Sequence, residues 1–173
     1  MNSPRKSLFT WLLALAAVSL SMSSVADDNP AFWRHQVTGD FDTVYAHLKS
    51  GLETGQFLIS GEENLAAGLE NNKHMFGKED WNKIGFKEVK AVHFCSILFN
   101  QEVFNINMEW SVLCPFKVVV YNMKKDPKKV TILMVRPSYI LEKDKTKQAK
   151  DIGKKIDDRI FGAITKSVRM EIP

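Results

Sequence analysis

The order of helix and strand patterns along the chain predicts an α+β domain. A β-branched run at Val118-Val119-Val120 marks a strand over 117–123. Asp126-Pro127 supplies a turn, and a second apolar run at 130–136 returns as the antiparallel partner. A helical stripe of apolar residues over 145–168 has the width that packs on a sheet. We therefore expect an antiparallel sheet of about four strands, with helices packed largely on one face and a long C-terminal helix.

The remaining elements are predicted from the spacing of apolar residues and from residues that begin or end helices and strands. Asp40 is placed to cap a helix over 41–55, because apolar residues follow it at helical spacing and Gly55 ends the run. The other expected elements are a strand over 56–60, a short helix over 63–69, a loop with buried aromatic anchors over 73–85, a strand over 86–95 and a helix over 100–110.

The first 26 residues have the pattern of an export signal. Arg5 and Lys6 precede an uncharged apolar run over 8–22, and small residues at Ser24 and Ala26 predict cleavage before residue 27. The run is short for a membrane span, which needs roughly 20 residues. We expect the mature protein to be periplasmic or secreted, without a transmembrane anchor after cleavage.

The mature chain is expected to begin with an irregular N-terminal arm over 27–39, followed by a single α+β domain over 40–173. Its charge is uneven: residues 27–116 carry a net charge of −6, and residues 117–173 a net charge of +8. Such polarity can steer an anionic partner or let copies pair head to tail, and the alternative is a solvated helix and loop. No nucleic-acid-binding motif is present, so nucleic acid is not an expected partner.

One segment resembles a known family. The motif His93-Phe94-Cys95, an intervening helix, and the run from Pro115 to Tyr121 resemble domain-of-unknown-function family 302 over about residues 41–137. The resemblance implies a compact α+β domain that is often dimeric. It implies no established activity, so no catalytic residue carries over. This chain departs from the pattern at Cys114, in a longer middle region and in its C-terminal helix.

Cys95 and Cys114 are the two cysteines of the chain. In an oxidising compartment two cysteines of one small domain most often pair, and we expect a structural disulfide. Two separate buried thiols, or a redox or metal role, are the alternatives. The spacing is not Cys-x-x-Cys, so a thioredoxin-type dithiol is absent from the sequence.

A metal site is the second hypothesis. His93 and Cys95 are two residues apart, so on a strand they face the same side. Met108, Met75 and His74 add soft ligands that suit copper or haem iron. The alternative is that His93 is a structural histidine and the methionines are packing residues. Covalent c-type haem attachment is not expected, because Cys-x-x-Cys-His is missing.

Three further residues are candidates for binding a ligand. Trp33 supplies an aromatic group in an irregular segment, while Tyr121 and Arg136 are suited to fixing an anion from the hairpin. Structural contacts are the alternative for all three. No catalytic motif is present. The leading hypothesis is an exported small binding domain for a ligand, metal, haem or partner protein, acting as a homodimer. The alternatives are a periplasmic redox or sulfur-chemistry protein using the two cysteines, and a structural interaction module.

Overall fold

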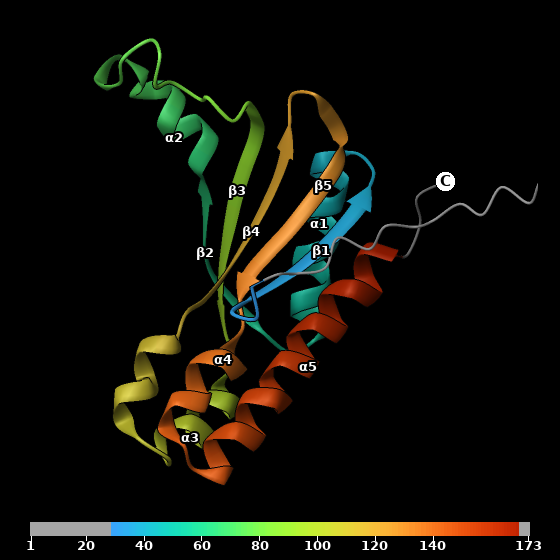
Figure 1. Ribbon diagram of the computed structural model, residues 1–173. Coiled ribbons are helices and arrows are strands. Elements are labelled where there is room, and N and C mark those ends of the chain that lie inside the picture. The colour runs from blue at the N-terminus through green and yellow to red at the C-terminus, as the bar shows by residue number, and fades with distance from the viewer. Residues whose placement is uncertain (1–28, 170–173) are drawn as a thin grey trace, which may run out of the picture.

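The computed structural model describes residues 29–169, which form a five-stranded antiparallel sheet with helices (Figure 1). The strand order is β1-β5-β4-β3-β2. The strands are β1 (Phe32–Thr38), β2 (Leu58–Asn64), β3 (Phe86–Cys95), β4 (Phe116–Met123) and β5 (Asp126–Val135). The predicted α+β class is confirmed, with five strands in place of about four. The predicted signal peptide lies outside the described residues.

Five α-helices accompany the sheet in the described part of the chain. They are α1 (Phe41–Thr54), α2 (Leu65–Asn71), α3 (Ile97–Phe104), α4 (Pro137–Leu141) and α5 (Lys147–Arg169). Asp40 caps α1 as expected, because its side chain accepts a hydrogen bond from the backbone N–H of Thr43 at 3.1 Å. None of the helices within residues 29–169 is both long and apolar enough to cross a membrane.

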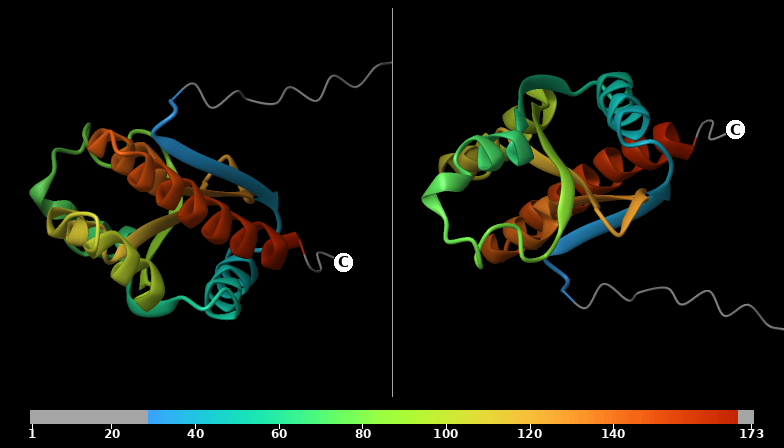
Figure 2. Two further views of the ribbon diagram at one scale, coloured as in Figure 1. Left: turned by 90° about the horizontal axis from the view of Figure 1, so that it is seen from below. Right: turned by 90° about the horizontal axis from the view of Figure 1, so that it is seen from above.

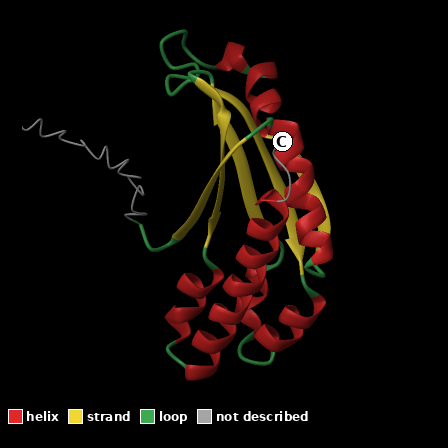
Figure 3. Ribbon diagram, turned by 90° about the vertical axis from the view of Figure 1, so that its right-hand side faces the viewer, coloured by secondary structure: helices red, strands yellow, loops and turns green. Residues whose placement is uncertain are grey.

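The core lies between one face of the sheet and the helices α1 and α5. Figure 2 shows α5 running the length of the domain beside α1, and Figure 3 shows helices packed against one side of the strands and below their ends. Alternate residues of the central strands are fully buried against these helices, namely Val92, Phe94, Val118, Val120, Val130 and Ile132. The apolar stripe of α5 packs on them through Ile156, Ile160 and Ile164. The opposite face of the sheet is left without a helix over its centre in the described residues.

The prediction of an irregular arm over 27–39 is wrong for residues 32–38. This segment is β1, and it pairs along its whole length with β5, from Phe32 opposite Val135 to Thr38 opposite Lys129. Within it Trp33, His35 and Val37 are half-buried, while the residues between them are exposed. His35 interrupts the apolar side of that period-two pattern, and the strand forms because β5 offers an edge to pair with.

The helix predicted over 100–110 is also corrected. The chain forms α3 over Ile97–Phe104 and then a separate 3₁₀ segment over Met108–Leu113. Asn107 divides them, because its side chain accepts a hydrogen bond from the backbone N–H of Glu109 at 2.9 Å and starts the second segment. α3 begins at Ile97, so Ser96 is the one residue between β3 and α3.

Candidate binding site on the uncovered sheet face

The sheet face that points away from α1 and α5 contains a hollow of about 590 Å³. Four strands and the loop before β3 line it. The lining residues are Gln36, Ile84, Phe86, Val89, Tyr121, Met123, Lys125, Asp126, Lys129, Thr131 and Leu133. The floor is therefore largely apolar, and the charged residues gather at the end formed by the β4–β5 hairpin.

Strand register brings the middle of this site together. Val89 lies opposite Tyr121, Tyr121 opposite Thr131, and Thr131 opposite Gln36, so one row crosses four strands. Residues opposite one another in a sheet share a face, which places all four side chains on the same surface. Gln36 Nε2 donates a hydrogen bond to Thr131 Oγ1 at 3.2 Å and closes the row at β1. Gln36 was missed from the sequence because its segment was expected to be irregular.

The loop before β3 forms a wall of the hollow and is held in place by Asn82. Its side-chain amide donates to the carbonyl of Phe86 at 2.8 Å, and its oxygen accepts from the backbone N–H of Phe86 at 2.8 Å. Gly85 has a φ of 74°, a value that favours glycine, and its carbonyl accepts from the backbone N–H of Lys124 at 2.8 Å. These bonds hold Ile84 beside the hairpin.

Asn122 fixes the hairpin at the end of the hollow. It is buried, and its side-chain oxygen accepts from the backbone N–H of Glu88 at 2.9 Å while its amide donates to the carbonyl of Pro127 at 2.9 Å. The strand register shifts at this point on both sides of β4. Asn122 thereby satisfies backbone groups that the shifted ladder leaves without partners. Its sequence signal was a polar residue after the apolar run at 118–120 and Tyr121.

The charged end of the hollow belongs to the hairpin turn. Lys125 and Lys129 line it, and Lys124 and Lys128 flank the same turn around Asp126. Within residues 29–169 none of these four lysines forms an ion pair with a carboxylate. The turn therefore presents an excess of positive charge to this end of the hollow.

The three predicted ligand-binding residues divide between two places. Tyr121 lines the hollow, whereas Trp33 and Arg136 meet on the helix side of the sheet. Trp33 stacks on Phe161 of α5 with ring centroids 4.4 Å apart, and the guanidinium carbon of Arg136 lies 5.4 Å from the centre of the same ring. Arg136 Nε also donates to the carbonyl of Phe32 at 3.2 Å. Both residues therefore pack α5 against β1 and β5, on the face of the sheet opposite Tyr121.

The two cysteines are joined in a disulfide, in agreement with the first of the alternatives drawn from the sequence. Their Cα atoms are 5.7 Å apart, and the bridge spans 19 residues. Asn100 Nδ2 lies 3.3 Å from Cys114 Sγ and donates a hydrogen bond to it. The bridge connects the end of β3 to the residue that precedes β4 by two positions, so it closes the α3 excursion between these strands.

The predicted metal ligands are not brought together. Cys95 shares its sulfur with Cys114 and offers no thiolate. His74 follows α2 at one end of the domain, whereas Met108 follows α3 at the other (Figure 1). Residues 29–169 contain no group of three or more His, Cys, Asp or Glu side chains placed to hold a metal ion. The expected ligand set for copper or haem is therefore not assembled in the described part of the chain.

His93 contacts Glu63 on the uncovered face. Its Nε2 lies 3.0 Å from Glu63 Oε1, and Lys117 Nζ lies 2.9 Å from Glu63 Oε2. The hydrogen bond from Lys117 is the main cause of a lowered pKa of the Glu63 carboxyl. The Lys117–Glu63 ion pair and the His93–Glu63 contact together connect β2, β3 and β4, which agrees with the structural interpretation of His93.

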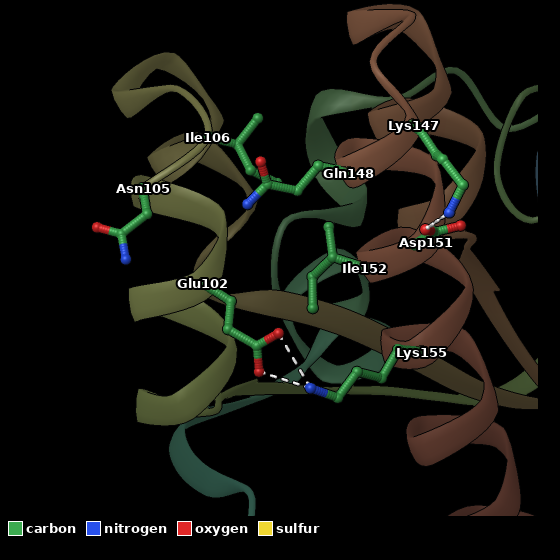
Figure 4. A pocket seen from close by; sticks show the side chains of 8 residues that line it. All are labelled: Glu102, Asn105, Ile106, Lys147, Gln148, Asp151, Ile152 and Lys155. Carbon is green, nitrogen blue, oxygen red and sulfur yellow. Dashed lines mark hydrogen bonds and ion pairs between the residues drawn. The ribbon is translucent and has the colours of Figure 1, made fainter.

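A second cavity, of about 560 Å³, lies between α3 and α5 (Figure 4). Figure 4 shows Glu102 pointing across it toward Lys155, and these side chains form an ion pair of 2.7 Å. Lys147 and Asp151 form another ion pair of 2.7 Å on its rim. Because all four charged side chains already have partners, this cavity has fewer charged groups available to bind a ligand than the hollow on the sheet has.

Comparison with known proteins identifies the family. A family model described as Domain of unknown function DUF302 matches residues 33–166. The crystal structure of an uncharacterized conserved protein DUF302 from Bacillus stearothermophilus is similar, with a TM-score of 0.67 and 16% sequence identity. The similarity covers 80% of this chain and 99% of that chain, and at this identity it shows a shared fold. No curated protein matches. The matched range includes most of α5, so the long C-terminal helix is part of the family match and not an addition to it. The chain therefore belongs to the DUF302 family.

Proposed function

We propose that the protein is a non-enzymatic binding domain that holds a small amphipathic anion on the uncovered face of its sheet. The observation that carries the proposal is the hollow of about 590 Å³, which joins an apolar floor to lysines without ion-pair partners in the described residues. Sites for small molecules span about 300–1,000 Å³. The hollow is therefore large enough for a ligand with a short apolar chain and a charged head.

The apolar side chains of the hollow favour a hydrocarbon or aryl group. Val89, Met123 and Leu133 project from three neighbouring strands, and Ile84 stands exposed at the wall. Covering such side chains removes apolar area from water at a gain of roughly 25 cal/mol per Å². The apolar part of a ligand would thus lie along the strands, with its head toward the hairpin.

The polar side chains favour a negative head group. The lining contains two lysines, Lys125 and Lys129, and one carboxylate, Asp126, which leaves a positive excess. The Tyr121 hydroxyl forms no hydrogen bond with another described residue and is free to donate one. The lining contains no histidine, cysteine or serine, so the proposal assigns binding and no reaction. We include export to the periplasm or medium in the proposal, on the pattern of residues 1–26.

Calorimetric titration of the purified protein tests the charge preference. Laurate and dodecyltrimethylammonium have the same alkyl tail and opposite head groups, so the protein should bind laurate at least tenfold more tightly. The double variant Lys125→Gln/Lys129→Gln should weaken laurate binding roughly tenfold, since each exposed charge contributes about 0.5–1 kcal/mol. Equal binding of both amphiphiles, or binding of neither, would overturn the proposal.

A matched pair on β5 tests the position of the site. Leu133→Gln places an amide in the hollow and should weaken laurate binding severalfold. Val135→Gln makes the same kind of change two residues along the same face, outside the lining, and should leave binding unchanged. Equal effects of the two variants would place the ligand elsewhere.

A second copy of the chain is the competing occupant of this face. Light scattering of the purified protein, with and without laurate, separates the two uses. A dimer that Leu133→Gln dissociates, in a protein that takes up no laurate, would assign the face to self-association and reject the ligand. A monomer that binds laurate supports the ligand.

Sulfur redox chemistry is the second candidate function, and partial exposure of the bridge favours it. Cys95 and Cys114 are both half-buried at the end of β3, outside the fully buried core. Equilibration with glutathione buffers followed by thiol titration tests this role. A bridge that opens at the potentials of known thiol oxidoreductases supports it, and a bridge that resists them rejects it.

A further inference from the structure

We infer that one end of the molecule docks on the surface of an anionic lipid bilayer. This basic end consists of residues 69–87 and the hairpin turn 124–129, which lie together at the top of Figure 1. The backbone N–H of Lys124 donates to the carbonyl of Gly85 at 2.8 Å and joins the two segments. The basic end shares Ile84, Lys125 and Lys129 with the lining of the hollow, but docking on lipid does not require a ligand in the hollow.

The basic end carries eight lysines and four acidic residues, a net charge of +4. Two of the acids are already neutralised, because Glu70 pairs with Lys73 and Asp80 with Lys83. The four lysines of the hairpin turn have no ion-pair partner among the described residues, and neither has Lys78. A cluster of unneutralised lysines is attracted to a negatively charged lipid surface, and each one adds to the affinity.

Exposed apolar side chains accompany these lysines. Met75 is 72% exposed and Ile84 is 76% exposed. Phe76 is also exposed and stacks on Trp81, with ring centroids 5.9 Å apart. Apolar and aromatic residues surrounded by lysines are typical of segments that lie in the boundary between head groups and acyl chains. A nucleic acid would use the lysines but would gain nothing from Met75 or Ile84.

The opposite end of the domain shows why charge selects the docking surface. Ile97, Leu98 and Val112 are also exposed there, so apolar exposure alone does not distinguish the two ends. Residues 96–115 contain no lysine or arginine and two glutamates. The N-terminal part of α5 adds lysines at this end, but three of them are paired: Lys147 with Asp151, Lys154 with Asp158 and Lys155 with Glu102. An anionic bilayer therefore attracts the basic end, with its unpaired lysines, more strongly, which orients the protein with the hairpin turn toward the lipid.

Co-sedimentation of the purified protein with lipid vesicles tests the proposal. We expect binding to vesicles of equal parts phosphatidylglycerol and phosphatidylcholine, weaker binding as salt is raised, and little binding to pure phosphatidylcholine. The double variant Lys124→Gln/Lys128→Gln, which leaves the lining of the hollow unchanged, should lower the partition coefficient about 20-fold. No binding to the mixed vesicles, or equal binding to both kinds, overturns the proposal.

Matched variants elsewhere on the surface complete the test. Lys150→Gln/Lys166→Gln removes two exposed lysines of α5 that also lack ion pairs in the described residues, and it should change the partition coefficient less than threefold. Met75→Ser should weaken vesicle binding severalfold, whereas Ile97→Ser should not. If Met75→Ser has no effect, or the α5 variant weakens binding as much as the hairpin variant, docking by the basic end is rejected. Leu133→Gln should leave vesicle binding intact, so failure of the ligand proposal and failure of this one are distinguishable.

Discussion

Ser138 and Asp157 are joined by two hydrogen bonds that fasten α4 to α5. The Ser138 hydroxyl donates to Asp157 Oδ2 at 2.6 Å, and the Ser138 backbone N–H donates to Asp157 Oδ1 at 3.1 Å. Asp157 is only 5% exposed, and this burial raises the pKa of its carboxyl. Gly153 of α5 allows α4 to approach closely, because a Cβ at this position would lie 2.8 Å from Ser138 Cα.

The raised pKa of Asp157 predicts a pH-dependent effect of Asp157→Asn. The folded state retains the Asp157 proton to higher pH than the unfolded state does, so this contribution to stability is present below the unfolded pKa of about 3.9 and is lost as pH rises through the folded value. Asn keeps an acceptor for Ser138 and does not ionise. The free energy of unfolding of Asp157→Asn, relative to the native protein, should therefore increase from pH 3.5 to pH 7, as measured by urea denaturation. The exposed neighbour Asp158→Asn is the control, and a relative stability of Asp157→Asn that does not change with pH would contradict the prediction.

The contact between α1 and α5 predicts opposite effects for two glycine substitutions. A Cβ at Gly51 would lie 2.8 Å from the carbonyl oxygen of Ala163, whereas a Cβ at Gly162 meets nothing within 4 Å. Gly51→Ala should destabilise the protein by about 1–3 kcal/mol because the helices must separate. Gly162→Ala should stabilise it by about 0.5–1 kcal/mol through helix propensity. Chemical denaturation of both variants measures the difference, and equal effects would show that the helices are not in close contact at Gly51.

Removal of the disulfide should lower stability without unfolding the sheet. A bridge closing a loop of this length contributes roughly 3 kcal/mol, mainly by restricting the unfolded chain. Cys95→Ala/Cys114→Ala should lose about that amount in urea denaturation, and reductant should then have no further effect. Denatured, non-reduced native protein should contain no titratable thiol, and detection of two thiols would disprove the bridge.

Loss of the Asn122 side chain should loosen the hairpin end of the hollow. Asn122→Ala leaves the N–H of Glu88 and the carbonyl of Pro127 without their side-chain partner, at a cost of about 2–3 kcal/mol. The rate of hydrogen exchange at the backbone amide of Glu88 should be higher in Asn122→Ala than in the native protein, because this amide loses its acceptor. The exposed Asn105, whose side chain bonds only to Gln101, provides the control: Asn105→Ala should cost less than about 0.5 kcal/mol. Unchanged exchange at Glu88 would argue against this function of Asn122.

Elements whose pattern is local were predictable. The strand expected over 86–95 is β3 residue for residue, and the helices over 41–55 and 145–168 correspond to α1 and α5 within two residues at each end. Their signals are apolar periodicity, a capping residue and a turn dipeptide, all of which operate within a few residues of the chain. β1 had no such signal, because its half-buried positions include His35 and its partner strand is distant: Gln36 bonds to Thr131 across a sequence separation of 95 residues.

The candidate site also has a part that was predictable from the sequence and a part that depends on tertiary structure. Tyr121 was recognised as a candidate because its residue type suits ligand binding, but the amino-acid order contains no information on which strand lies beside it. The shared face of Val89, Tyr121, Thr131 and Gln36 depends on the register of three strand pairs, and the end of the hollow depends on Asn122 and on the loop held by Asn82. The sequence alone was sufficient for the fold class, the main elements and the family resemblance, since these depend on short-range preferences. Only tertiary packing determined that Cys95 is bonded to Cys114, that Trp33 and Arg136 support α5, and that the hollow forms at Tyr121, because each depends on contacts between residues far apart in the chain.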